Sequence, residues 1–269
     1  MKIKIILLSL FLAVVSVISA QSSKYVRQVR KIKNFKSLNV SGVVDVIVIP
    51  SKNYKVTVES TTKCIGKIKT KLEGDALHIY NDRIFLKSFK RNKQIHMKVF
   101  VEMPEINKVN LSGAGDITLK EGFSSINFKA KVSGSGDLKI PALNTVLFIL
   151  NVSGSGDAYI GGNIKNLECE ISGSGDVKTK NLNLARASVE ISGAGDMKLN
   201  GIVKTLAIDI SGAGDFNGES LESEVAVVDL SGATDVVLNK VTRSLEVRKS
   251  IAASFKLLGK PPKHYVCRK

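Results

Sequence analysis

Hydrophobic and polar residues alternate strictly over much of the chain. Apolar residues occupy every second position in the segments 128–132, 146–152, 187–191 and 206–210. Shorter apolar pairs follow at Leu138/Ile140, Ala158/Ile160, Met197/Leu199 and Val236/Leu238. A period of two is typical of a β-strand with one buried face. Beyond the first twenty residues no stretch shows a persuasive helical period, so we predict an all-β protein.

A five-residue motif, SG[AS]GD, separates these strands. It stands at 112–116, 133–137, 153–157, 172–176, 192–196 and 211–215, with the variant SGATD at 231–235 and weaker relatives at 41–45 and 250–254. The steps between the aspartates from Asp116 to Asp235 are 21, 20, 19, 20, 19 and 20 residues. A propeller blade needs about 40 residues, whereas a repeat of about 20 suits one solenoid turn. We therefore predict a single-chain β-solenoid, similar to a parallel β-helix, with its motifs stacked in register.

The alternation also orients the motif. If the chain runs straight through it, Gly154 and Gly156 point inward, where glycine permits a sharp bend or a close approach of the opposite wall. Ser153, Ser155 and Asp157 then point outward. The alternative is a tight turn in which the aspartate accepts backbone N–H bonds. In both cases we interpret the aspartates as a structural ladder, which consists of Asp116, Asp137, Asp157, Asp176, Asp196, Asp215 and Asp235.

Stacked carboxylates repel one another, by about 0.9 kcal/mol for two charges one strand spacing apart in water. Serine hydroxyls, backbone amides, lysines or bound cations must offset this repulsion. The motif superficially resembles the calcium-binding nonapeptide G-G-x-G-x-D, but its period is twice as long and its Gly and Asp are adjacent. We favour the structural interpretation over a calcium site, and we predict no metal and no other cofactor.

The two ends of the chain differ from the repeats. Residues 1–20 combine a basic start, an apolar run and a small-residue end, as in a secretory signal peptide that is removed. We expect one solenoid domain over 21–260, with irregular basic rungs at 21–110, regular repeats at 111–257 and a tail at 261–269. No transmembrane span is expected after cleavage. Cys169 is expected to be a buried thiol, and a bridge between Cys64 and Cys267 is an option that we do not favour.

Charge is distributed unevenly. Residues 21–110 carry 19 Lys/Arg and 7 Asp/Glu, residues 111–239 carry 10 and 16, and residues 240–269 carry 9 and 1. Export argues against nucleic acid as the partner of these basic ends. The segment 83–98 is best interpreted as a solvated loop. Its functional interpretation is contact with an anionic glycan, lipopolysaccharide or phospholipid surface, and the candidate contact residues are Arg83, Lys87, Lys90, Arg91 and Lys93.

The patterns favour a binding or structural module over an enzyme. An acid–base pair needs two unequal environments, whereas the repeats offer near-identical aspartates. The three histidines, His78, His96 and His264, match no triad or metal spacing. A polysaccharide-active β-helix enzyme is the alternative. A self-associating envelope scaffold, which would be a homo-oligomer, is another, because open solenoids expose strand edges at their ends.

The order of segments carries a family resemblance. A basic strand-like start (RQVRKIKNFKSLNVSGVVDVIVI), then YKVTVES, GDALHIY and IHMKVFVEMPEINKVNLSGAGDITL, and then the SGSGD repeats stand within residues 27–257. This chain resembles the family called putative auto-transporter adhesin, head GIN domain, which is typical of Bacteroidetes. The resemblance implies a β-solenoid fold. With the signal peptide and the charge distribution, it leads us to expect an adhesin-like binding or structural module in the periplasm, at the outer-membrane surface or outside the cell. The expected partner is an anionic glycan, lipopolysaccharide or an envelope protein. It implies no catalytic or binding residues.

Overall fold

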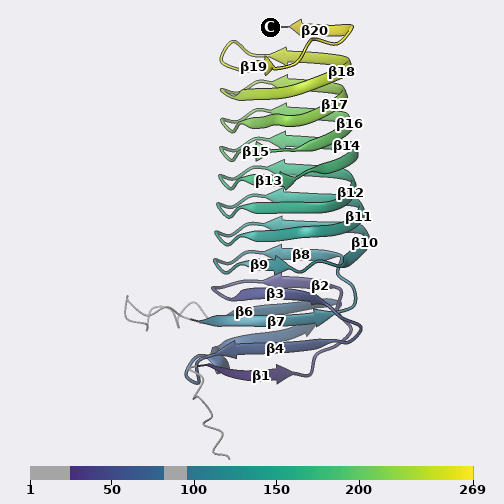
Figure 1. The fold of residues 1–269 in the computed structure, drawn as a ribbon. Helices are drawn as coiled ribbons and strands as arrows, with labels where there is room; N and C mark the ends of the chain where they lie inside the picture. The colour runs from purple at the N-terminus through teal and green to yellow at the C-terminus, as the bar shows by residue number, and fades with distance from the viewer. Residues whose placement is uncertain (1–24, 82–95, 269) are drawn as a thin grey trace, which may run out of the picture.

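The computed structural model describes residues 25–81 and 96–268, which form one column of stacked strands (Figure 1). The column begins at β1 (Val26–Arg30) and ends at β20 (His264–Arg268). Within the described residues the single helix is the short 3-10 turn η1 (Ile65–Lys67). The predicted all-β solenoid with rungs of about 20 residues is confirmed. No helix in 25–81 or 96–268 has the length and apolarity to cross a membrane.

Each regular rung contains a short strand, a bend, a long strand and the SG[AS]GD turn. The short and long strands are continuous in β11 (Leu138–Val152), β12 (Ala158–Ile171), β17 (Phe216–Leu230) and β18 (Asp235–Lys249). They are separate in β9 (Ile117–Leu119) and β10 (Phe123–Val132), β13 (Val177–Lys180) and β14 (Leu182–Ile191), and β15 (Met197–Lys198) and β16 (Gly201–Ile210). The last rung consists of β19 (Ser254–Leu257) and β20, and β20 lies in the segment expected to be a tail.

Neighbouring rungs pair in parallel with equivalent residues opposite one another. On the short-strand side Ala158 pairs with Leu138 and with Val177, and on the long-strand side Cys169 pairs with Leu150 and with Val189. Because the register is kept at both sides, each motif lies directly on the preceding one. The rungs are therefore stacked in register, as the repeat predicted.

The inward-facing side chains fill the column with apolar residues. Phe128 and Phe148 are fully buried on adjacent rungs, with their ring centroids 5.5 Å apart and the rings tilted by 56°. One inward assignment is wrong: Val146 is 46% exposed. The strand bends there, and the inward series continues from Thr145 to Phe148, three positions on. The bend therefore makes a corner between the two parts of β11.

The N-terminal strands do not follow the order of the chain. They are β2 (Ser37–Val40), β3 (Asp45–Pro50), β4 (Lys55–Ser60), β5 (Ile68–Glu73), β6 (Ala76–Asn81), β7 (Met97–Met103) and β8 (Lys108–Leu111). The rung formed by β2 and β3 lies between β6/β7 on one side and β8/β9 on the other. Beyond β7 and β6, the strands β4, β1 and β5 pair antiparallel and end the column. The parallel arrangement thus applies from β6/β7 upward.

Candidate functional site

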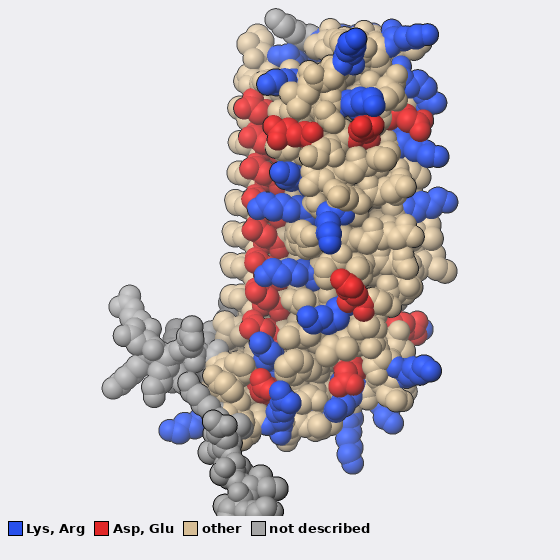
Figure 2. All heavy atoms as spheres, viewed as in Figure 1, with Lys and Arg blue, Asp and Glu red and all other residues tan. Residues whose placement is uncertain are grey.

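The aspartates of the motif form a continuous column along one edge of the molecule, visible as the red band in Figure 2. The backbone N–H of Asp176 donates to Oδ1 of Asp157 at 2.9 Å, and the carbonyl of Asp176 accepts from the N–H of Ala158 at 2.8 Å. Equivalent N–H to Oδ1 bonds of 2.7–3.1 Å run from Asp45 to Asp235. Each aspartate therefore attaches its rung to the preceding one at the turn.

These backbone donors offset the repulsion between the carboxylates. A hydrogen bond to a charged acceptor is stronger than one between neutral groups. Two lysines add to this effect: Lys139 Nζ lies 3.7 Å from Asp116 Oδ2 and 3.6 Å from Asp137 Oδ2, and Lys178 Nζ lies 3.6 Å from Asp176 Oδ2. In the part of the chain that the structure describes, no three His, Cys, Asp or Glu side chains are placed to share a metal ion. The contacts favour a structural role for the column.

The glycines of the motif are required by the neighbouring rung and not by the opposite wall. Gly154 is half-buried and Gly156 is buried, so only the second glycine matches the expected inward position. A Cβ atom on Gly154 would lie 2.0 Å from the carbonyl oxygen of Gly134, and one on Gly156 would lie 2.0 Å from that of Gly136. The preceding rung therefore leaves no room for a side chain at these positions. The alternation of residues within one rung gives no sign of this contact between rungs.

Removing one carboxylate is expected to weaken the column moderately. Asp157→Ala takes away the acceptor of the Asp176 N–H, which we expect to lower the free energy of unfolding by about 1–2 kcal/mol. Asp157→Asn keeps an acceptor oxygen and should cost less than about 1 kcal/mol. Urea unfolding followed by circular dichroism measures both, with the exposed Glu168→Ala as the matched control. Strong stabilisation of the parent by calcium, lost in Asp157→Asn, would contradict the structural interpretation.

The predicted basic contact residues lie outside the described residues. They are Arg83, Lys87, Lys90, Arg91 and Lys93. Their contact with an anionic ligand therefore stays a prediction.

The histidines and cysteines do not form a catalytic cluster in the described structure. His96 Nε2 lies 2.8 Å from Glu59 Oε1, and the ring stacks on Tyr25 with centroids 3.9 Å apart. Burial alone would raise the pKa of Glu59, but hydrogen bonds from Arg27 and His96 outweigh it and lower the pKa. His78 contacts Asn39 and Glu73. These contacts hold strands of the N-terminal rungs together.

All three cysteines are free. Cys64 and Cys169 are buried and Cys267 is exposed. A bridge between Cys64 and Cys267 is absent, because Cys64 precedes η1 in the first rungs whereas Cys267 is on β20 at the opposite end. Cys169 is a buried thiol as expected, and burial raises its pKa to about 12. It is therefore not a reactive thiolate at neutral pH.

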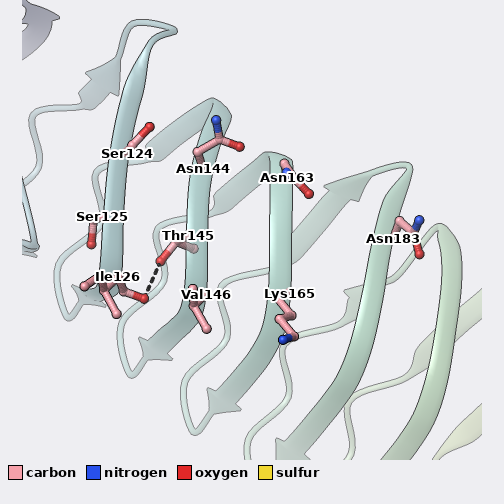
Figure 3. Close-up of a pocket in the computed structure, with 9 residues that line it drawn as sticks. All are labelled: Ser124, Ser125, Ile126, Asn144, Thr145, Val146, Asn163, Lys165 and Asn183. Atoms are coloured by element: carbon pink, nitrogen blue, oxygen red, sulfur yellow. Dashed lines mark hydrogen bonds between the residues drawn. The ribbon is translucent and has the colours of Figure 1, made fainter.

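An open groove crosses the strands β10, β11, β12 and β14 where each long strand begins (Figure 3). It has a volume of about 690 Å³. One row of lining side chains is polar and repeats from rung to rung: Ser124, Asn144, Asn163 and Asn183. A second row contains Ile126, Val146 and Lys165. The groove thus offers amides, exposed apolar groups and one ammonium group side by side.

The bend in each rung holds these rows in place. The Thr145 hydroxyl lies 3.1 Å from the carbonyl oxygen of Ile126 and 3.0 Å from that of Leu147. The Asn166 amide donates to the carbonyl of Val146 at 3.2 Å. These bonds fix the backbone carbonyls of Ile126 and Val146. The two residues are nevertheless 75% and 46% exposed. Ile126 and Val146 thus form a small exposed apolar surface beside the polar row.

The sequence analysis missed this groove. Its signal was available, because Ser124, Asn144, Asn163 and Asn183 are separated by 20, 19 and 20 residues, which is the period of the motif. The recurring inward residues and aspartates dominate the repeat, so the outward polar positions stand out less. A search for polar residues that repeat at the solenoid period would have found this row.

The sequence matches the model of a known family over nearly all of the described residues. The match to putative auto-transporter adhesin, head GIN domain, covers residues 34–200 and again 166–261. The chain belongs to this family. Its description supports a surface adhesin-like role, and the family resemblance read from the motif order is confirmed. No curated protein matches the sequence significantly.

Solved structures share the fold. A putative adhesin from Bacteroides fragilis is 16% identical, with a TM-score of 0.65 over 92% of this chain and 98% of that one. A putative adhesin from Parabacteroides merdae is 17% identical, with a TM-score of 0.66 over 92% and 96%. A putative lipid binding protein from Parabacteroides distasonis is 16% identical, with a TM-score of 0.58 over 92% and 98%. At such identities the likeness concerns the fold alone.

Proposed function

We propose that this protein is exported and acts at the cell surface as an adhesin-like module that binds a carbohydrate chain. Family membership and the signal-peptide pattern of residues 1–20 support export and a surface role. The regular rungs support binding over catalysis, since successive motif aspartates share the same hydrogen bonds and offer no unequal acid–base pair. A rigid column with an extended lateral surface suits attachment.

The observation that carries the carbohydrate assignment is the polar row of the groove. Amide side chains both donate and accept hydrogen bonds, and so do sugar hydroxyls. The row presents Asn144, Asn163 and Asn183 on successive rungs, which are about 4.8 Å apart. This spacing is similar to the length of one sugar unit in an extended chain. Ile126 and Val146 can contact the C–H faces of the same sugars, and Lys165 can contact an acidic substituent.

The test is a glycan-binding screen followed by titration of the best glycan. Replacing Asn144, Asn163 and Asn183 together with Ala should weaken binding at least tenfold, because three amide contacts are lost while the buried core is unchanged. The matched control replaces Asn151, Ser188 and Thr205 with Ala, which removes polar groups from the long strands outside the groove. Melting temperatures of both triple variants verify that the solenoid is intact.

Other outcomes separate the alternative ligands. A glycan with acidic groups should bind less well as salt increases, since such attraction is screened over about 8 Å at physiological ionic strength. Full binding by the groove variant would contradict the assignment and favour lipopolysaccharide or an envelope protein at another surface. Release of reducing sugar ends, abolished by a single aspartate substitution, would favour the enzyme alternative.

A further inference from the structure

Two polar side chains occupy inward-facing positions at the N-terminal end of the column. β1 lies antiparallel to β4, with Gln28 opposite Val58 and Arg30 opposite Val56. Both valines are fully buried. Directly opposite residues share one face of a sheet. Gln28 and Arg30 therefore stand on the face that is apolar in the regular rungs, but at this open end Gln28 is exposed and Arg30 is half-buried.

β5 is the last strand at this end on the side of the column formed by β6 and β2. It pairs only with β6 among the described strands, so its second edge presents unpaired backbone groups. Thr70 is opposite the buried Ile79 and faces inward, whereas Lys69 is opposite Tyr80 on the outer face. A hollow of about 460 Å³ lies between β1 and β5, and its lining includes Gln28, Arg30, Lys69, Thr70, Lys71 and Tyr80. Figure 2 shows Lys and Arg side chains projecting at this lower end of the molecule.

Among the described residues, Arg30 and Lys69 of the hollow form no ion pair with an acid. Lys71 Nζ lies 2.7 Å from Glu73 Oε1, which offsets one charge. The Nε of Arg30 is buried and has no hydrogen-bond partner in the described structure. A buried donor without an acceptor is unfavourable. Polar capping of a solenoid end accounts for Gln28 and Thr70. It does not account for the unpaired Nε of Arg30 in a hollow that Lys69 and Lys71 also line.

We propose that this hollow binds a phosphate group. A guanidinium matches phosphate oxygens in a planar, two-pronged geometry, and ammonium groups add point charge. Arg30, Lys69, Lys71 and Tyr80 all line the hollow, the last three from the outer face at its rim, and each carries a hydrogen-bond donor for such an anion. The phosphate can belong to a lipid headgroup or be free in solution. This site is independent of the groove, which lies on later rungs.

Calorimetric titration of the protein with inorganic phosphate tests the assignment. Arg30→Met should weaken phosphate binding at least tenfold, and Lys69→Ser with Lys71→Ser should weaken it similarly. The matched control is Lys178→Ser with Lys198→Ser, a pair on adjacent rungs far along the column, for which binding should change less than twofold. Without phosphate, Arg30→Met should not lower the melting temperature, since it removes a nitrogen that lacks a partner.

Sedimentation with phosphatidylcholine vesicles, with and without phosphatidylglycerol, distinguishes the sources. Binding that requires phosphatidylglycerol and is lost in Arg30→Met supports a lipid headgroup. Phosphate binding without vesicle binding supports a soluble phosphate compound. Unchanged phosphate binding in both the Arg30 and the lysine variants would overturn the proposal, and so would the failure of both probes to bind the parent protein.

Discussion

Gly173→Ala is expected to lower the free energy of unfolding by more than about 4 kcal/mol, or to prevent folding altogether. The added Cβ would lie 2.1 Å from the carbonyl oxygen of Gly154 and 2.7 Å from the carbonyl carbon of Ser153. Both atoms are backbone, so no side chain can move aside. The two rungs would have to separate and lose the hydrogen bonds between them. Urea unfolding followed by circular dichroism measures the effect.

The neighbouring residue provides the control. Ser174 is exposed, and Ser174→Ala should change stability by less than about 0.5 kcal/mol. Three end copies of the motif have a larger residue at the second glycine position: Val44, Thr234 and Ala253. The Thr234 hydroxyl donates to the carbonyl of Gly214 at 2.7 Å. All three residues lie in the first or the last copies of the motif, whereas the six inner copies keep glycine at this position. A loss below about 1 kcal/mol in Gly173→Ala would show that the inner rungs can adjust to an added Cβ atom.

Phe148→Ala should lower the free energy of unfolding by about 3–5 kcal/mol. Phe148 is fully buried in the middle of the column, where it packs on Phe128. Truncation removes apolar contacts and leaves a cavity, because the rungs on either side are fixed by their backbone hydrogen bonds and cannot collapse into it. Urea unfolding followed by circular dichroism measures this effect as well.

Ile126→Ala is the matched control for the aromatic residue. Ile126 is 75% exposed on the rung below, so its truncation should cost less than about 0.5 kcal/mol. Equal losses in the two variants would mean that burial does not determine the stability of this region. The free energy of unfolding of Phe148→Leu should lie between those of the parent and of Phe148→Ala, since leucine fills part of the cavity.

The sequence contained the information for the regular rungs. Alternation identified the buried faces of residues such as Leu150 and Ile191, and the 20-residue period fixed their stacking. The alternation is a local signal and the 20-residue spacing is a periodic one. Both can therefore be recognised in a single sequence. Val146 was assigned inward because the alternation continues through it, but the bend at the corner interrupts the period of two without changing the residue pattern.

Other features depend on contacts that leave no periodic trace. The insertion of β2/β3 between β7 and β8 joins segments some 70 residues apart, such as Leu38 and Val109. The glycine requirement arises between rungs, and the groove arises from outward residues on four rungs. The position of Arg30 opposite Val56 follows from an antiparallel pairing that hydrophobic patterning does not specify. These are the places where sequence reasoning was incomplete.

The direction of the hydrogen bonds has a mechanical consequence. The bonds between rungs, including the aspartate column, run along the length of the molecule, and β1 and β20 lie at its opposite ends. Tension applied between these ends loads the terminal rung first and opens its bonds one after another. A force applied across the column is instead shared by the hydrogen bonds of many rungs at the same time. An attachment that pulls sideways on the solenoid would therefore be held more firmly than one that pulls along it.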